Sequence, residues 1–362
     1  MRHTVLIPVF LGAAMVAASA AERLERDNLL SYRAADGRVA TVQTTAEWQR
    51  RRAEILSSMQ AIMGPLPGPA RRVPLDVTIE RETDCDTYVR REISYAAEPG
   101  ARVPAFLLIP KSVLTGKARA RGILCLMPTN NLEGNRPVVG LGGPSGKPGR
   151  NYGEELALRG CVVIAPPYPH LGDYKPDLEQ LGYRSGTMKA IWDNIRALDV
   201  LAATPGVLTG DFGAVGHSLG GHNAIFTAVF DERITAVVSN CGFDSFLDYY
   251  GGKPELWRAG QAWAQPRYMP AMAGYAGRLG EIPFDFHELV GALAPRAFLA
   301  LAPLRDSNFK WESVDRIIAA ARPVYQLYGV PERLAVEHPD IEHDFPPDMR
   351  EKAYAWLERF LK

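Results

Sequence analysis

The sequence predicts an α/β fold in which a mostly parallel sheet is covered by helices on both faces. From about residue 120 onward, short apolar runs typical of buried strands alternate with longer helical stretches. One strand-to-helix junction, at 216–220, reads Gly-His-Ser-Leu-Gly and matches the pattern G-x-S-x-G. With 362 residues, the chain is long enough for one large α/β domain plus an extension.

The first twenty residues have the three parts of a secretory signal peptide. Arg2 and His3 give a basic start, and the apolar stretch at 5–16 is too short to span a bilayer. Ala18-Ser19-Ala20 is an A-x-A site, which predicts cleavage before Ala21. We therefore expect an exported protein, periplasmic or extracellular, without a membrane span after leader removal.

Residues 21–110 are predicted to form an N-terminal extension ahead of the catalytic domain, 111–362. The extension should contain a helix over 45–63, which a Gly-Pro pair ends. Two strand-like runs follow, 88–95 and 103–109, and they resemble an antiparallel opening of the main sheet.

The catalytic domain is predicted from its alternation of strands and helices. The expected strands are 122–126, 162–165, 212–215, 234–239, 297–302 and 334–338, and the expected helices are 187–203, 222–228 and 349–361. Between about 243 and 283 this pattern breaks down, and aromatic residues gather with glycines and prolines. We expect a small cap insertion there, whose aromatic rings either stack on substrate or form a satellite core.

The junction at 216–220 is predicted to be a nucleophile elbow. The strand before it and the helix after it supply the sharp turn that holds Ser218 at strained backbone angles. Gly216 and Gly220 remove side chains where strand and helix nearly touch. The alternative is an ordinary glycine turn, so the prediction depends on whether partners for Ser218 follow in the chain.

The expected partners follow in the order acid and then histidine. Asp306 lies in the loop after the strand 297–302, where a carboxylate that orients an imidazole belongs. Asp244, after the preceding strand, is the rival acid. His343 lies in the loop after the last strand and is the predicted general base, because imidazole can accept the serine proton near neutral pH.

Two backbone N–H groups are needed to stabilise the oxyanion of the reaction. Leu219 directly follows the nucleophile and should supply one of them. Thr129 should supply the other from the loop after the strand 122–126, since Pro128 has no N–H. The candidates for the substrate pocket are Met127, His217, His170, Trp257 and Tyr268.

Composition argues against partners such as nucleic acids and membranes and against metal cofactors. The formal net charge is zero, which does not favour a nucleic acid or an anionic membrane as a partner. The four cysteines form no CxxC or Cys/His cluster, so we expect neither a metal nor another cofactor. The sequence leaves the oligomeric state open.

With the elbow, the acid loop and the histidine loop in place, the chain resembles secreted bacterial α/β-hydrolases of the dienelactone-hydrolase-like and acetyl-xylan-esterase-like families. The resemblance covers about 45–362 and includes the segments 216–223, 302–306 and 343–347. It implies a serine esterase that works through an acyl-enzyme on small or carbohydrate-linked esters, such as acetyl esters. It departs from true dienelactone hydrolases, which have a cysteine as nucleophile where this chain has Ser218.

Two alternatives stay open at this point. A serine peptidase of the prolyl-oligopeptidase kind shares this core, although the region before the core is too short for a propeller domain. The second alternative is a non-catalytic binding protein with the same fold, because one fold can serve many functions.

Overall fold

The computed structural model describes residues 23–143 and 150–362. The predicted leader, 1–20, lies outside the described residues. Among the helices that are described, none is long and apolar enough to cross a membrane.

Within the described residues, nine strands form one sheet in the order β11-β10-β9-β8-β6-β7-β5-β4-β3, and β1 and β2 form a separate small pair. The strands are β1 (Ser31–Arg33), β2 (Val39–Thr41), β3 (Thr78–Cys85), β4 (Tyr88–Glu98), β5 (Ala101–Pro110), β6 (Ala120–Leu126), β7 (Val162–Ala165), β8 (Val207–His217), β9 (Ile234–Asn240), β10 (Ala297–Leu301) and β11 (Leu334–Glu337). Neighbouring strands are parallel along the part of the sheet that runs β11-β10-β9-β8-β6-β7. The pairs β7–β5, β5–β4 and β4–β3 are antiparallel. The predicted α/β fold with a mostly parallel sheet is therefore confirmed.

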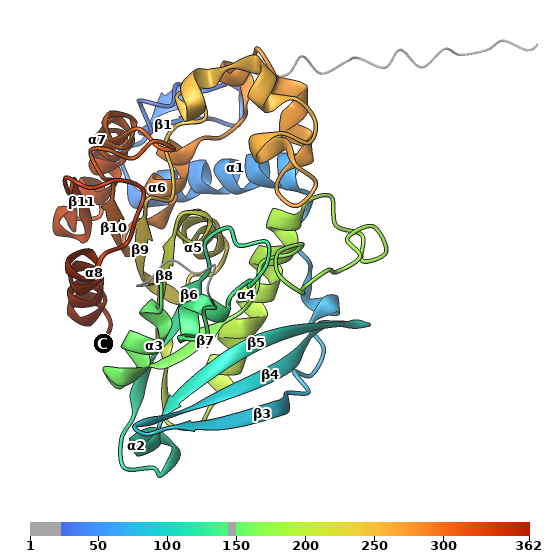
Figure 1. Cartoon of the computed structure of the whole chain (residues 1–362). Helices are drawn as coiled ribbons and strands as arrows, with labels where there is room; N and C mark the ends of the chain where they lie inside the picture. The colour runs from blue at the N-terminus through green and yellow to red at the C-terminus, as the bar shows by residue number, and fades with distance from the viewer. Residues whose placement is uncertain (1–22, 144–149) are drawn as a thin grey trace, which may run out of the picture.

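Helices cover both faces of this sheet (Figure 1). They are α1 (Thr45–Met63), α2 (Lys111–Leu114), α3 (Tyr152–Leu158), α4 (Gly186–Ala203), α5 (Leu219–Phe230), α6 (Phe286–Leu293), α7 (Trp311–Leu327) and α8 (Pro347–Phe360). The connection from β6 to β7 runs in one direction across the sheet, and the later parallel connections run in the other. Because such crossovers are right-handed, α3 covers one face while α4, α5, α6 and α7 cover the opposite one. Arg350 of α8 pairs with Glu155 of α3 at 2.8 Å, so α8 lies with α3.

The reversal of direction between β6 and β8 positions the functional site. Ligands of open α/β sheets bind outside the carboxyl ends of the strands where the order reverses. Here the loop after β6 carries Thr129 and the turn after β8 carries Ser218, on neighbouring strands. The same sheet includes β3, β4 and β5, so the extension over 21–110 and the region after it share one sheet.

Between β9 and α6 the described chain has short 3-10 helices in place of regular elements, as the broken sequence pattern indicates. They are η3 (Tyr249–Gly252), η4 (Pro254–Trp257), η5 (Ala262–Ala264), η6 (Pro270–Tyr275) and η7 (Leu279–Glu281). This segment, which we call the cap, lies beside α1 at the top of the molecule, far from β3, β4 and β5 (Figure 1). Further short 3-10 turns are η1 (Pro69–Arg71), η2 (Arg136–Val139) and η8 (Pro331–Arg333).

Candidate active site

The turn between β8 and α5 has the geometry of a nucleophile elbow. Ser218 has φ 55° and ψ −122°, a strained conformation for a residue with a side chain. Its N–H donates to the carbonyl oxygen of Asn240 at the end of β9, at 2.9 Å, which anchors the turn to the neighbouring strand. Because α5 begins at Leu219, directly after Ser218, the positive end of its dipole lies at this turn.

Gly216 and Gly220 let the strand and helix of this elbow approach each other closely. A Cβ atom on Gly216 would clash with the backbone of Gly220, and one on Gly220 would clash with the carbonyl oxygen of Leu126. Both obstacles are backbone atoms, which cannot turn aside as a flexible side chain can. The elbow therefore requires glycine at both positions.

Replacing Gly216 by alanine should destabilise the protein by roughly 3 kcal/mol or more, because overpacking against fixed backbone strains the fold. Urea unfolding followed by circular dichroism measures this change. Gly274→Ala is the matched control, since a Cβ atom there meets nothing within 4 Å and φ lies outside the left-handed region. Equal stability of the two variants would contradict the close approach described here.

A chain of hydrogen bonds connects the three side chains that the sequence selected. Nε2 of His343 lies 3.0 Å from Oγ of Ser218, and Nδ1 lies 2.9 Å and 3.0 Å from the two carboxylate oxygens of Asp306. The side chain of Asp306 is 1% exposed and that of His343 is 19% exposed. Asp306 also accepts the backbone N–H of Asn308, at 2.7 Å, and that of Phe309, at 3.2 Å. This arrangement can hold the imidazole in the tautomer that accepts the serine proton.

Asp244, the rival acid, bonds the loop after Asp306, whereas Asp306 itself bonds His343. Its Oδ2 accepts the backbone N–H of Lys310 at 3.2 Å, and its Oδ1 has no hydrogen-bond partner among the described residues. Burial, helped by nearby Asp248 and Asp285, holds the pKa of Asp244 well above its usual range. Burial thus disfavours the carboxylate form of Asp244, which is the form that stabilises an imidazolium. The geometry thus favours Asp306 as the acid.

Sequence reasoning missed Cys241, which lies against the acid. In the described residues, ligand atoms of Cys241, Asp306 and His343 lie within 4.8 Å of one another. Asp306 and His343 already bind each other, and burial raises the pKa of the Cys241 thiol well above its ordinary value. A metal would need a thiolate and would displace this hydrogen bond, so the group fits a hydrogen-bonded relay rather than a metal site.

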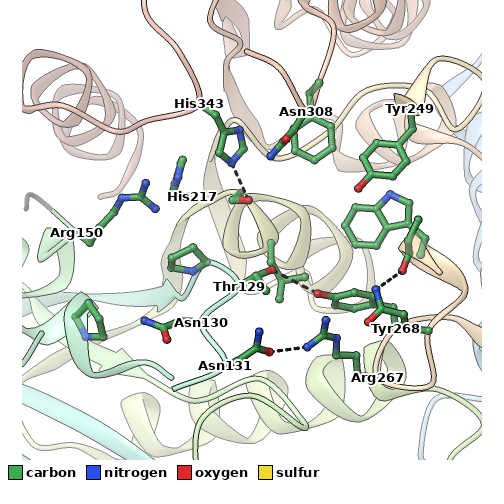
Figure 2. Close-up of a pocket in the computed structure, with 18 of the residues that line it drawn as sticks. Thr129, Asn130, Asn131, Arg150, His217, Tyr249, Arg267, Tyr268, Asn308 and His343 are labelled. Carbon is green, nitrogen blue, oxygen red and sulfur yellow. Dashed lines mark hydrogen bonds between the residues drawn. The ribbon is translucent and has the colours of Figure 1, made fainter. Parts of the chain in front are cut away.

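Ser218 and His343 open on a cavity of about 670 Å³ (Figure 2). One wall comes from the loop after β6 and the opposite wall from the cap. Its further lining residues include Thr129, Asn130, Asn131, Arg150, His217, Leu219, Tyr249, Trp263, Gln265, Arg267, Tyr268 and Asn308. The cavity thus combines aromatic rings with amide, hydroxyl and guanidinium groups, which is typical of sites that bind polar ligands.

Two of the five predicted pocket residues, His217 and Tyr268, line this cavity. The hydroxyl of Tyr268 lies 3.4 Å from Oγ1 of Thr129 and so bridges the cap to the loop after β6. The ring of His217 packs on that of His343, with centroids 4.9 Å apart. Leu219 and Thr129, the predicted oxyanion residues, also line the cavity, and their catalytic role stays a prediction.

The other three predicted pocket residues lie outside the cavity lining, which corrects the sequence-based prediction. Met127 is buried in the hydrophobic core at the end of β6. Trp257 is fully buried and packs on Phe246 within the cap, where it supports the wall without reaching the cavity. His170 is held in a turn by a hydrogen bond from its N–H to the carbonyl oxygen of Tyr174, at 2.8 Å.

His222, four residues after the nucleophile, links the elbow to the cap. Its ring is stacked between Phe226 and Trp263, with centroid distances of 4.1 Å and 4.2 Å. Neither ring nitrogen has a hydrogen-bond partner among the described residues. Complete burial in this apolar stack lowers the pKa of His222 to about 3, so the ring is neutral in the folded protein near neutral pH.

This lowered pKa predicts that His222 contributes to acid unfolding. A folded-state pKa below the ordinary 6.5 means that the unfolded chain binds a proton first, so stability is present above about pH 6.5 and declines as pH falls toward 3. The loss should approach about 1.4 kcal/mol per pH unit. In His222→Phe, which keeps the aromatic stack, this part of the decline should vanish. Urea unfolding between pH 7.5 and pH 4.5 measures it, and parallel stability curves for both proteins would contradict the prediction.

The fold and the hydrogen-bonded relay define an α/β-hydrolase with a site of the serine-hydrolase type. Residues 180–329 match the family model described as "Glucuronyl esterase, fungi", and these residues include the elbow and the acid loop. This match agrees with the predicted resemblance to α/β-hydrolase esterases.

Individual relatives agree with this family match. A 4-O-methyl-glucuronoyl methylesterase of Phanerochaete carnosa is 25% identical over 186 residues, which cover 47% of this chain and 45% of that protein. The chain thus spans less than half the length of this curated relative. A solved glucuronoyl esterase from Solibacter usitatus has a TM-score of 0.70 and 19% identity, over 92% of this chain and 96% of that one. A family 15 carbohydrate esterase from Caldicellulosiruptor kristjansonii has a TM-score of 0.67 and 20% identity, over 91% and 89%.

Proposed function

We propose that this protein hydrolyses carboxylic esters through an acyl-enzyme, with Ser218 as nucleophile, His343 as general base and Asp306 as the orienting acid. The observation that carries the proposal is the hydrogen-bonded relay from Asp306 through His343 to Ser218, which opens on the cavity. Cofactors are not required, because the three side chains supply both the nucleophile and the proton transfers.

In the proposed reaction, Oγ of Ser218 attacks the carbonyl carbon of the ester while Nε2 of His343 takes the hydroxyl proton. The backbone N–H groups of Leu219 and Thr129 stabilise the oxyanion of the tetrahedral intermediate. His343 then returns the proton to the leaving alcohol oxygen as the carbon–oxygen bond breaks. A water molecule cleaves the acyl-enzyme by the same steps and releases the acid.

We further propose that the alcohol or acid part of the substrate is a carbohydrate. The rings of Tyr249, Trp263 and Tyr268 line the cavity beside amide and guanidinium groups, a combination suited to the apolar faces and hydroxyls of a sugar. The relatives named above are esterases of glucuronoyl groups, which supports the same class of substrate. Assays on acetylated xylan and on a methyl glucuronate ester distinguish an acetyl ester from a uronate ester as the cleaved bond.

The predicted signal peptide at 1–20 supports export to the periplasm or the extracellular space, where a polymer-linked substrate is accessible. We propose this localisation for the mature protein.

A panel of esters tests the proposed function. Purified mature protein is assayed on nitrophenyl esters from acetyl to octanoyl, on acetylated xylan, on a methyl glucuronate ester and on a proline-anilide peptide, with Ser218→Ala as control. We expect Ser218-dependent turnover of short esters and of at least one carbohydrate ester. Cleavage of the peptide alone, or no ester turnover by folded protein, would contradict the proposal.

A further inference from the structure

The charge of the cavity is one-sided. Two guanidinium groups, those of Arg150 and Arg267, line it, and none of its described lining residues is an aspartate or a glutamate. Figure 2 shows the two arginines on opposite sides of the cavity, with His343 between them at its upper edge. A cavity with this lining attracts negative charge and repels cations.

Arg267 comes from the cap and faces the loop after β6. Its Nη1 donates to Oδ1 of Asn131 at 2.7 Å, and its guanidinium lies over the ring of Tyr268 at 5.1 Å. Its Nε is buried and has no hydrogen-bond partner among the described residues. A neutral amide and an aromatic ring orient this guanidinium for a ligand and do not offset its positive charge.

Arg150 holds a similar position on the other side. Its Nη2 lies 3.2 Å from Oδ1 of Asp344, next to His343, and its side chain is 11% exposed. Its Nε is also buried without a partner among the described residues. The side chain of Asp344 is 46% exposed, so solvent screens its carboxylate, which offsets only part of the positive charge of Arg150. Arg267 is thus the stronger candidate for an anionic ligand.

We propose that the cavity selects esters of acidic carbohydrates, in which a free carboxylate elsewhere in the same molecule binds the guanidinium of Arg267. This inference rests on the proposed ester hydrolysis and specifies its substrate class. The pairing of a planar guanidinium with a carboxylate through two parallel hydrogen bonds gives both attraction and orientation. Arg150 adds attraction from the opposite wall.

Recognition of neutral sugar hydroxyls by Arg267 would leave a different signature. Loss of a contact to a hydroxyl would lower kcat/KM for all carbohydrate esters alike. Loss of a contact to a carboxylate would lower kcat/KM only for the anionic esters. The charge contact also depends on ionic strength, because salt screens attraction between partly exposed charges.

The test uses two pairs of glycosides, and the members of each pair differ only in whether the aglycone carries a carboxylate or a neutral amide. One pair consists of methyl glucuronate glycosides of 4-hydroxybenzoate and 4-hydroxybenzamide, and the other of the corresponding 6-O-acetyl glucosides. The leaving alcohol is methanol in both members of the glucuronate pair, and the transferred acyl group is acetyl in both members of the other pair. The ratio of kcat/KM for the anionic to the neutral member therefore measures selection for the carboxylate.

For the wild type we expect a ratio of about 10 or more at low salt, which falls as salt rises to 0.5 M. Arg267→Gln should lower kcat/KM about tenfold for the anionic member and less than about twofold for the neutral one. Arg267→Lys should keep part of the ratio, because lysine keeps the positive charge but lacks the planar guanidinium that donates two parallel hydrogen bonds. The control is Arg278→Gln, in the cap but paired with Glu281 at 2.6 Å and outside the cavity lining.

A ratio near 1 in the wild type, or an equal loss on both members in Arg267→Gln, would overturn the inference. Ser218-dependent hydrolysis of the neutral members would at the same time keep the proposed function. If the folded wild type cleaves no member of either pair, both the inference and the proposed function fail on these substrates.

Discussion

Replacing Ser218 by alanine should lower kcat on ester substrates by about 10⁶-fold, because the nucleophile and the relay act as one unit. The fold should persist, since alanine removes only the hydroxyl and takes the same φ of 55°. Rates are measured with a fluorogenic or nitrophenyl ester, and stability is measured by urea unfolding.

This prediction separates chemistry from structure because stability and turnover are measured on the same preparation. A variant that unfolds at the same urea concentration as the wild type but keeps more than about 1% of its turnover would contradict the assignment of Ser218.

Replacing Asp306 by asparagine should lower kcat by about 10⁴-fold, because an amide favours the wrong imidazole tautomer and cannot stabilise the imidazolium. Both carboxylate oxygens of Asp306 lie within 3.0 Å of Nδ1 of His343, so the substitution acts directly on the base. The amide can still accept the backbone N–H groups of Asn308 and Phe309, which limits the structural damage.

Asp244→Asn is the matched control for that experiment. Burial raises the pKa of Asp244 and so favours its neutral form, of which an amide is a close isostere. Its oxygen can still accept the N–H of Lys310, so kcat should stay within about tenfold of the wild type. A larger loss in Asp244→Asn than in Asp306→Asn would contradict the choice of acid.

The sequence is sufficient to place the turn around Ser218 and the loops of Asp306 and His343, because each is specified locally. Gly216 and Gly220 determine the turn around Ser218, and the ends of apolar strands locate the loops of Asp306 and His343. Parallel strands then bring these loops to one edge of the sheet, so their meeting follows from topology. The predicted bounds of α1, 45–63, agree with the observed Thr45–Met63, because Gly64 is a strong local signal for the end of a helix.

Strand β3, by contrast, was not predicted. Most of Thr78–Cys85 is exposed, because β3 lies at the edge of the sheet and is paired only with β4. Without a buried face, the strand shows no alternation of apolar and polar residues, and its charged residues instead protect an open edge. Periodicity cannot detect such a strand.

The cavity was predicted only in part because its walls depend on irregular backbone. The cap has no helical or strand period from which to tell which aromatic side chains point inward. Trp257 is therefore buried within the cap, while Trp263, six residues later, lines the cavity. Arg150 and Arg267 come from segments far apart in the chain, and Cys241 approaches Asp306 only in the folded protein. Sequence spacing carries no signal for these contacts.

Covalent labelling of Ser218 tests the central claim most directly. Folded mature protein is treated with a fluorophosphonate, digested, and examined by mass spectrometry. We predict a single adduct on the peptide that contains Ser218, which is lost in Ser218→Ala and strongly slowed in His343→Ala, since the reagent requires a serine activated by a base. No adduct on folded protein, or an adduct on another residue that persists in Ser218→Ala, would contradict the account.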